Sequence, residues 1–112
     1  MPRKSVAAYV GGKGPRQWIW EAIRSLASQD PLATFTEAEI WSAIPIAARE
    51  TIEIGAIRDY RRALVAASII DLVTAPEAIG ARATYRLAKD EGLEAPRVRR
   101  DGTRVTQGLA QE

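Results

Sequence analysis

The amino-acid sequence predicts an α+β fold that is mainly α, in which three helices precede a two-stranded β-hairpin. Two observations support this prediction. Apolar residues recur at helical spacing in three segments that carry helix start or stop signals. The chain then changes to β-branched and alternating residues on either side of a turn-rich loop. With 112 residues the chain has the length of one domain, which we expect at residues 15–89.

The first helix is predicted over residues 15–28, after a flexible arm at residues 1–14. Gly14 can cap this helix, and Pro15 suits its first position because an N–H there would stay unpaired. The next proline, Pro31, excludes a longer helix. The apolar stripe of this helix consists of Ile19, Ala22, Ile23 and Leu26. Two tryptophans, Trp18 and Trp20, flank the stripe.

The second helix is predicted from its cap, Thr36, to about Ala43, where a proline soon follows. Thr36 stands three residues before Glu39, which is the spacing of a capping box. A brief strand at residues 34–36 precedes this helix, and the connecting stretch at residues 46–54 has room for one more helical turn.

The third helix is predicted over residues 54–69 and is expected to be the longest. Its apolar stripe consists of Ile57, Tyr60, Leu64 and Ala67. Arg61 adjoins this stripe, so its stem can pack while its charged head reaches solvent. The opposite face carries Gly55, Arg58, Asp59, Arg62 and Ala66.

The hairpin is predicted from strands at residues 69–74 and 82–87, which residues 75–81 connect. Residues 90–112 have no sustained apolar period and are punctuated by glycine and proline. We therefore expect a poorly ordered, basic tail there, with arginines at Arg97, Arg99, Arg100 and Arg104.

The residue inventory argues against catalysis. The chain has no histidine and no cysteine, which removes the commonest general base, the usual zinc ligand and any thiolate. Its glycine-rich segment at residues 11–14 contains Lys13, but no Ser or Thr follows this lysine, as a phosphate-binding loop would require. We therefore expect no enzymatic activity, no cofactor and no metal.

Charge and hydropathy indicate a soluble protein with a segregated charge distribution. No apolar run reaches the ~20 residues of a membrane span, and no signal peptide is recognisable, so we expect a cytoplasmic location without membrane contact. The net charge is only +2, but bases exceed acids in residues 1–34 and 55–90, whereas residues 35–54 are acidic.

Two segments resemble a known family. Residues 57–70, which read IRDYRRALVAASII, resemble the third helix of winged helix-turn-helix DNA-binding domains and the strand that follows it. Residues 83–87, which read ATYRL, are similar to the returning strand of the wing. The resemblance is to proteins of phages and mobile elements and to transcriptional regulators. Ser68 departs from the pattern, because these domains often carry glycine there.

The resemblance implies that the protein binds double-stranded DNA, with the third helix in the major groove and the wing on adjacent backbone. Arg58 and Arg62 lie four residues apart on one helix face, so they would read base edges or neighbouring phosphates. The remaining contacts, to backbone, would come from Arg61, Arg82, Lys13 and Arg16. A homodimer would have to use the first helix and its tryptophans.

Other interpretations remain open. The same fold serves in some proteins as a protein–protein interaction module without DNA readout, and the chain could be a fragment of a larger DNA-processing enzyme. The two arginines could also form a solvated face, with Arg58 paired to Glu53, and Arg62 paired to Asp59 or Glu77.

Overall fold

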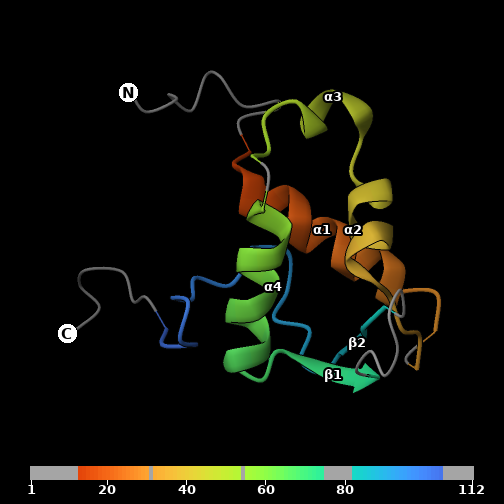
Figure 1. The fold of residues 1–112 in the computed structure, drawn as a ribbon, viewed down its shortest axis with the longest axis vertical. Coiled ribbons are helices and arrows are strands. Elements are labelled where there is room, and N and C mark those ends of the chain that lie inside the picture. The colour runs from red at the N-terminus through yellow and green to blue at the C-terminus, as the bar shows by residue number, and fades with distance from the viewer. Residues whose placement is uncertain (1–12, 31, 54, 75–81, 105–112) are drawn as a thin grey trace.

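The computed structural model is an α+β fold that is mainly helical (Figure 1). It describes residues 13–30, 32–53, 55–74 and 82–104. In chain order the elements are α1 (Pro15–Ala27), α2 (Glu37–Ala43), α3 (Ile46–Arg49), α4 (Ala56–Ala66), β1 (Ile70–Thr74) and β2 (Thr84–Leu87). The described residues thus hold four helices rather than three, because the stretch between α2 and α4 forms the short α3.

The helix ends follow local signals. Pro15 is the first residue of α1, and the Thr36 side chain accepts a hydrogen bond from the Glu39 N–H in the predicted capping box of α2. The expectation that the third helix is the longest is wrong, since α1 has 13 residues and α4 has 11. The predicted helix at residues 54–69 is shorter because Gly55 and Ser68 adopt left-handed backbone, with φ of 90° and 62°, on either side of α4.

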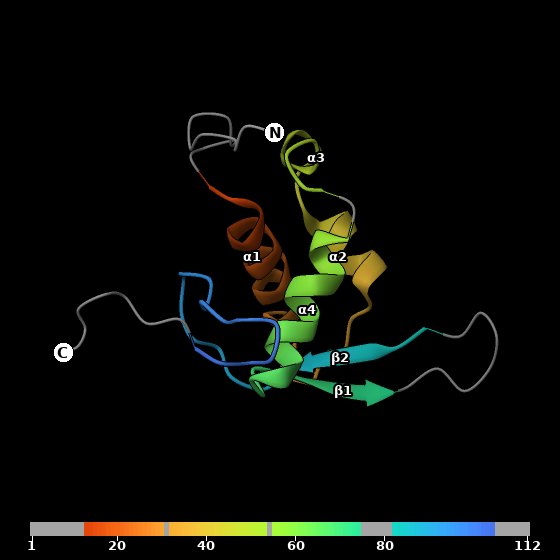
Figure 2. The same ribbon diagram turned by 60° about the vertical axis from the view of Figure 1, so that its left-hand side comes forward.

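The sheet pairs β1 with β2 in antiparallel register, with Leu72 opposite Tyr85. Tyr85 also exchanges two backbone hydrogen bonds with Phe35, which confirms a brief extended pairing at residues 34–36. Phe35 therefore lies on the other side of β2 from β1. Figure 2 shows the hairpin extending away from the foot of α4. The predicted connecting loop at residues 75–81 lies outside the described residues.

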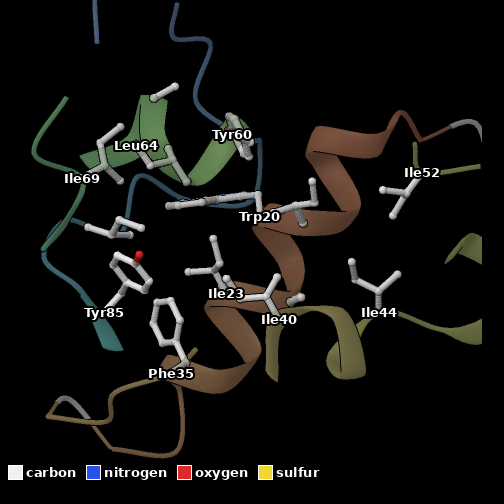
Figure 3. Close-up of a cluster of buried hydrophobic side chains, with 14 of the residues drawn as sticks. Trp20, Ile23, Phe35, Ile40, Ile44, Ile52, Tyr60, Leu64, Ile69 and Tyr85 are labelled. Carbon is white, nitrogen blue, oxygen red and sulfur yellow. The ribbon is translucent and has the colours of Figure 1, made fainter. Parts of the chain in front are cut away.

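The hydrophobic core forms where α1, α2 and α4 meet the sheet (Figure 3). The Trp20 ring reaches from α1 toward Tyr60 and Leu64 of α4, and all three side chains are buried. Tyr85 is buried as well, so Tyr60 and Tyr85 lie in the core as the helical and strand patterns predict. Because Trp20 is fully buried, a dimer interface on α1 could not use it.

Residues 90–104 pack against the helices, and we call this segment the C-terminal strap. The Trp20 Nε1 donates to the Gly92 carbonyl at 2.8 Å, and the Tyr60 hydroxyl donates to the Pro96 carbonyl at 2.7 Å. Val98 is buried in the core. The expectation of a poorly ordered tail is therefore wrong for residues 90–104, because backbone carbonyls and buried apolar side chains anchor them.

Two further expectations lie partly or wholly outside the described residues. The predicted flexible arm at residues 1–14 is described only at Lys13 and Gly14, and the end of the predicted tail, residues 105–112, is not described. Within the described ranges, every helix is too short or too polar to cross a membrane.

Candidate nucleic-acid interface

The outward face of α4 carries Arg58 and Arg62. Both arginines are exposed, because the opposite side of α4 buries Tyr60, Ala63 and Leu64 in the core. They lie four residues apart, so they are neighbours on one helix face. The two guanidinium groups form a positively charged row along the helix, in the arrangement that their spacing predicts.

No acid in the described part of the chain forms an ion pair with either arginine. Among residues 13–30, 32–53, 55–74 and 82–104, the ion pairs involve neither Arg58 nor Arg62. The pairing of Arg58 with Glu53, and of Arg62 with Asp59, is therefore not found, and Glu77 lies outside the described residues. Both guanidinium groups have donors to offer to an anionic partner.

Arg61 has a different environment from its two neighbours. Its side chain is only 17% exposed, its Nε donates to the Glu37 carboxylate at 2.6 Å, and its guanidinium lies 4.9 Å from the centre of the Tyr85 ring. The expectation that its head reaches solvent is wrong, because Glu37 at the start of α2 binds it. Arg61 therefore ties α4 to α2 and β2. Burial raises the pKa of Tyr85, although the Arg61 charge opposes this shift.

Arg82 is exposed just before β2, at the start of the returning strand. It lines a shallow hollow together with Arg61, Leu72 and Tyr85. This hollow lies between the start of α2 and the hairpin, so Arg82 adds an exposed cation on the hairpin side of α4.

Lys13 and Arg16 at the start of α1 contact the protein itself. The Lys13 ammonium lies 2.9 Å from the Glu21 carboxylate and 4.5 Å from the centre of the Trp18 ring. Partial burial of Glu21 raises its pKa, but hydrogen bonds from Gln17 and Lys13 outweigh this and lower it. Arg16 donates to the Val98 carbonyl at 2.8 Å.

Arg16 also lies over the ring of Tyr60, 4.8 Å from its centre, on the buried side of α4. The structure therefore does not bring Arg16 onto the outward face of α4 that Arg58 and Arg62 occupy. Its contacts make it an anchor for the C-terminal strap.

Sequence reasoning missed the turn within the strap. Val98 pairs with Arg104 across this turn, and Arg99 and Arg100 are exposed on it. The Asp101-Gly102 pair is a turn signal that could have indicated local structure there. The absence of an apolar period hid that structure, because the strap docks mainly through its backbone.

The described residues offer positive charge and hydrogen-bond donors rather than a ligand set for a metal. In the part of the chain that the structure describes, no group of acidic side chains could hold a metal ion. No protein-family model, curated protein or solved structure matches the chain.

Proposed function

We propose that this protein is a winged-helix DNA-binding protein, with α4 in the major groove and the hairpin on the adjacent backbone. The observation that supports this function best is the row of Arg58 and Arg62, exposed and without an ion pair among the described residues, beside a projecting hairpin. Such a protein would act as a transcriptional regulator or as an accessory protein of a phage or mobile element.

The order of elements supports the winged-helix assignment. Helix α1, the extended Phe35, α2, α4 and the β1–β2 hairpin follow one another as the resemblance of residues 57–70 and 83–87 implies. Phe35 joins the free edge of β2, so the hairpin is fixed to the helices by a third backbone segment. Helix α3 is then an extra turn between the second and third helices of the domain.

The physical chemistry of α4 suits a groove. An α-helix fits the major groove of B-DNA, and 11 residues span about 16 Å. Arginine presents a planar fork that can bind the O6 and N7 atoms of guanine or two phosphate oxygens. Asp59 on the exposed side and the net charge of +2 reduce the overall attraction, so binding should depend on the local arginine row.

The first test measures binding to a mixed-sequence DNA duplex by fluorescence anisotropy across a series of salt concentrations. Wild type should bind with an affinity that falls as salt rises, because phosphate contacts release counterions. The Arg58→Ala, Arg62→Ala variant removes two positive charges from the contact surface and should reduce the log–log slope by up to about 2. The matched control is Arg58→Lys, Arg62→Lys, which keeps the charge and should keep most of the slope.

Two outcomes would contradict the proposal at different levels. If wild type at micromolar concentration binds DNA without salt dependence or does not bind, the DNA-binding function is wrong. If wild type binds and the double alanine variant binds identically, α4 is not the contact surface.

A second candidate function is a protein–protein interaction module. Trp41 and Ile46 are 39% and 74% exposed, and Trp41 lines a hollow between α2 and α4 together with Ile52 and Ile57. Exposed apolar groups of this size favour a protein contact. Sedimentation velocity would test self-association through this surface, which the Trp41→Ala, Ile46→Ser variant should abolish.

A further inference from the structure

The turn at residues 99–102 lies at the end of the arginine row on α4. A Cβ atom built on Gly102 would lie 2.6 Å from both the carbonyl carbon and the carbonyl oxygen of Ala66. Such distances mean that the Gly102 backbone packs directly on the last turn of the helix. Ala66 is one helical turn beyond Arg62, which is itself one turn beyond Arg58. The turn therefore extends the same face of α4.

The turn has its own hydrogen bonds. The Gly102 N–H donates to the Arg99 carbonyl at 2.8 Å, and the Arg99 N–H donates to the Thr103 carbonyl at 2.8 Å. The Thr103 N–H donates to the Asp101 carboxylate at 2.9 Å. Gly102 has a φ of 91°, a conformation that side-chain-bearing residues rarely adopt. These bonds hold the turn in one shape.

Polar groups of the strap make hydrogen bonds and an ion pair on both sides of this turn. Arg104 forms a two-pronged ion pair with Glu91, and the Tyr60 hydroxyl holds the Pro96 carbonyl. By contrast, Arg99 and Arg100 are exposed and belong to none of the ion pairs among the described residues. Arg104 is thus held in an ion pair within the strap, whereas Arg99 and Arg100 are exposed on the turn.

We infer that the turn at residues 99–102 is a second DNA-contacting element, in which Arg99 and Arg100 bind backbone phosphates beside the groove that α4 occupies. This inference rests on the proposed function. Figure 2 shows the strap on one side of α4 and the β1–β2 hairpin on the other, so the two elements would flank the helix. A turn that is already ordered loses less conformational entropy on binding than a flexible arm would.

The partner is the phosphate backbone rather than base edges. Arg99 and Arg100 are adjacent in an exposed turn rather than on a helix that could enter a groove, so their guanidinium groups are suited to phosphate oxygens. Hydrogen bonds from Thr103 lower the pKa of Asp101, so this carboxylate stays charged and offsets part of the attraction between the turn and a phosphate. The turn should therefore raise the affinity for all duplex sequences to a similar extent.

The experiment compares wild type, the Arg99→Ala, Arg100→Ala variant and the Lys89→Ala variant on a mixed-sequence duplex across a salt series. Lys89 is exposed, lies outside the strap and the outward face of α4, and reports what the loss of one surface charge does by itself. We expect the double alanine variant to reduce the log–log slope by about 2 and the affinity about tenfold or more near physiological salt. Lys89→Ala should change the slope far less per charge removed. Arg99→Lys, Arg100→Lys should keep the wild-type slope.

The outcomes separate this inference from the function on which it rests. One outcome is that wild type shows salt-dependent binding, but Arg99→Ala, Arg100→Ala reduces the log–log slope no more per removed charge than Lys89→Ala does. In that case the turn makes no phosphate contact, while the α4 assignment stands. If wild type does not bind the duplex, the DNA-binding function fails first and the inference falls with it. Far-ultraviolet circular dichroism of each variant checks that the exposed substitutions leave the fold intact.

Discussion

Ser68 ends α4 with a backbone conformation that favours glycine. Its N–H donates to the Val65 carbonyl, and the following Ile69 N–H donates to the Leu64 carbonyl, which together form a Schellman motif. Leu64 and Ile69 are both fully buried, so the apolar contact of this motif is present too. Ser68 has a φ of 62°, in the left-handed region where glycine is less strained than a residue with a Cβ.

We expect Ser68→Gly to stabilise the protein by about 0.5–1 kcal/mol, because glycine adopts left-handed backbone without the steric cost of a Cβ. Urea denaturation at neutral pH measures the change in the free energy of unfolding. The matched control is Ser25→Gly at an exposed position within α1, which should destabilise the protein by about 0.5 kcal/mol. A Ser68→Gly variant that is no more stable than wild type would contradict this explanation of how α4 ends.

At the scale of elements, the C-terminal strap connects α1 to α4. Its carbonyls accept hydrogen bonds from Trp20 of α1 and from Tyr60 of α4, and its turn packs on the end of α4. These contacts give hydrogen-bond acceptors to the indole N–H of Trp20 and the hydroxyl of Tyr60, which would otherwise be buried without partners. Burial raises the pKa of Tyr60, so its hydroxyl keeps the proton that it donates to Pro96.

The two strap glycines at left-handed positions, Gly92 and Gly102, should respond differently to a methyl group. Both have positive φ, of 100° and 91°, but only Gly102 would place a Cβ against Ala66, since Gly92 has open space around it. Gly92→Ala should cost about 1–2 kcal/mol of backbone strain. Gly102→Ala should cost about 1–3 kcal/mol beyond that and displace the turn from α4.

Limited trypsin digestion together with urea denaturation distinguishes these effects. Cleavage after Arg99 and Arg100 should be faster in Gly102→Ala than in Gly92→Ala. A turn displaced from α4 can enter the active site of trypsin more readily than a turn packed on the helix. Equal cleavage rates and equal stabilities in the two variants would mean that the turn does not dock on Ala66.

For the whole molecule, acid should weaken two ion pairs of the strap, one that joins it to α1 and one between two of its own residues. The Arg24 guanidinium holds the pKa of Asp90 below its usual range, and the Arg104 guanidinium does the same for Glu91. A lowered pKa in the folded state means that each pair stabilises the protein fully above the unfolded pKa of about 4. The stabilisation is then lost as the pH falls through the folded pKa.

We therefore expect the free energy of unfolding to change little between pH 6 and 8, where a chain without histidine has few groups to titrate, and to decline below about pH 4. The Arg24→Gln, Arg104→Gln variant should lose less stability between pH 7 and pH 3 than wild type. The difference should be up to about 1 kcal/mol for each exposed pair. Urea denaturation at both pH values measures it, and an equal loss in both proteins would show that the pairs do not stabilise the strap.

Local features of the fold and of the candidate site were predictable from the sequence. Glu39 lies within one helical turn of Thr36, and Arg62 lies one turn from Arg58, so spacing alone predicts the capping box and the shared face. The alternating residues around Tyr85 likewise predict a strand with one buried face. Each of these features depends only on side chains that are close along the chain.

The sequence by itself therefore determined the class of fold, the starts of α1 and α2 and the exposed row of Arg58 and Arg62. Only the tertiary structure decided that Arg61 pairs with Glu37, 24 residues away, and that the C-terminal strap docks on α1 and α4. The physical reason is that the strap is held by backbone carbonyls and by the close approach of Gly102 to Ala66. Carbonyls are the same in every residue, so they leave no pattern in the sequence to predict such contacts.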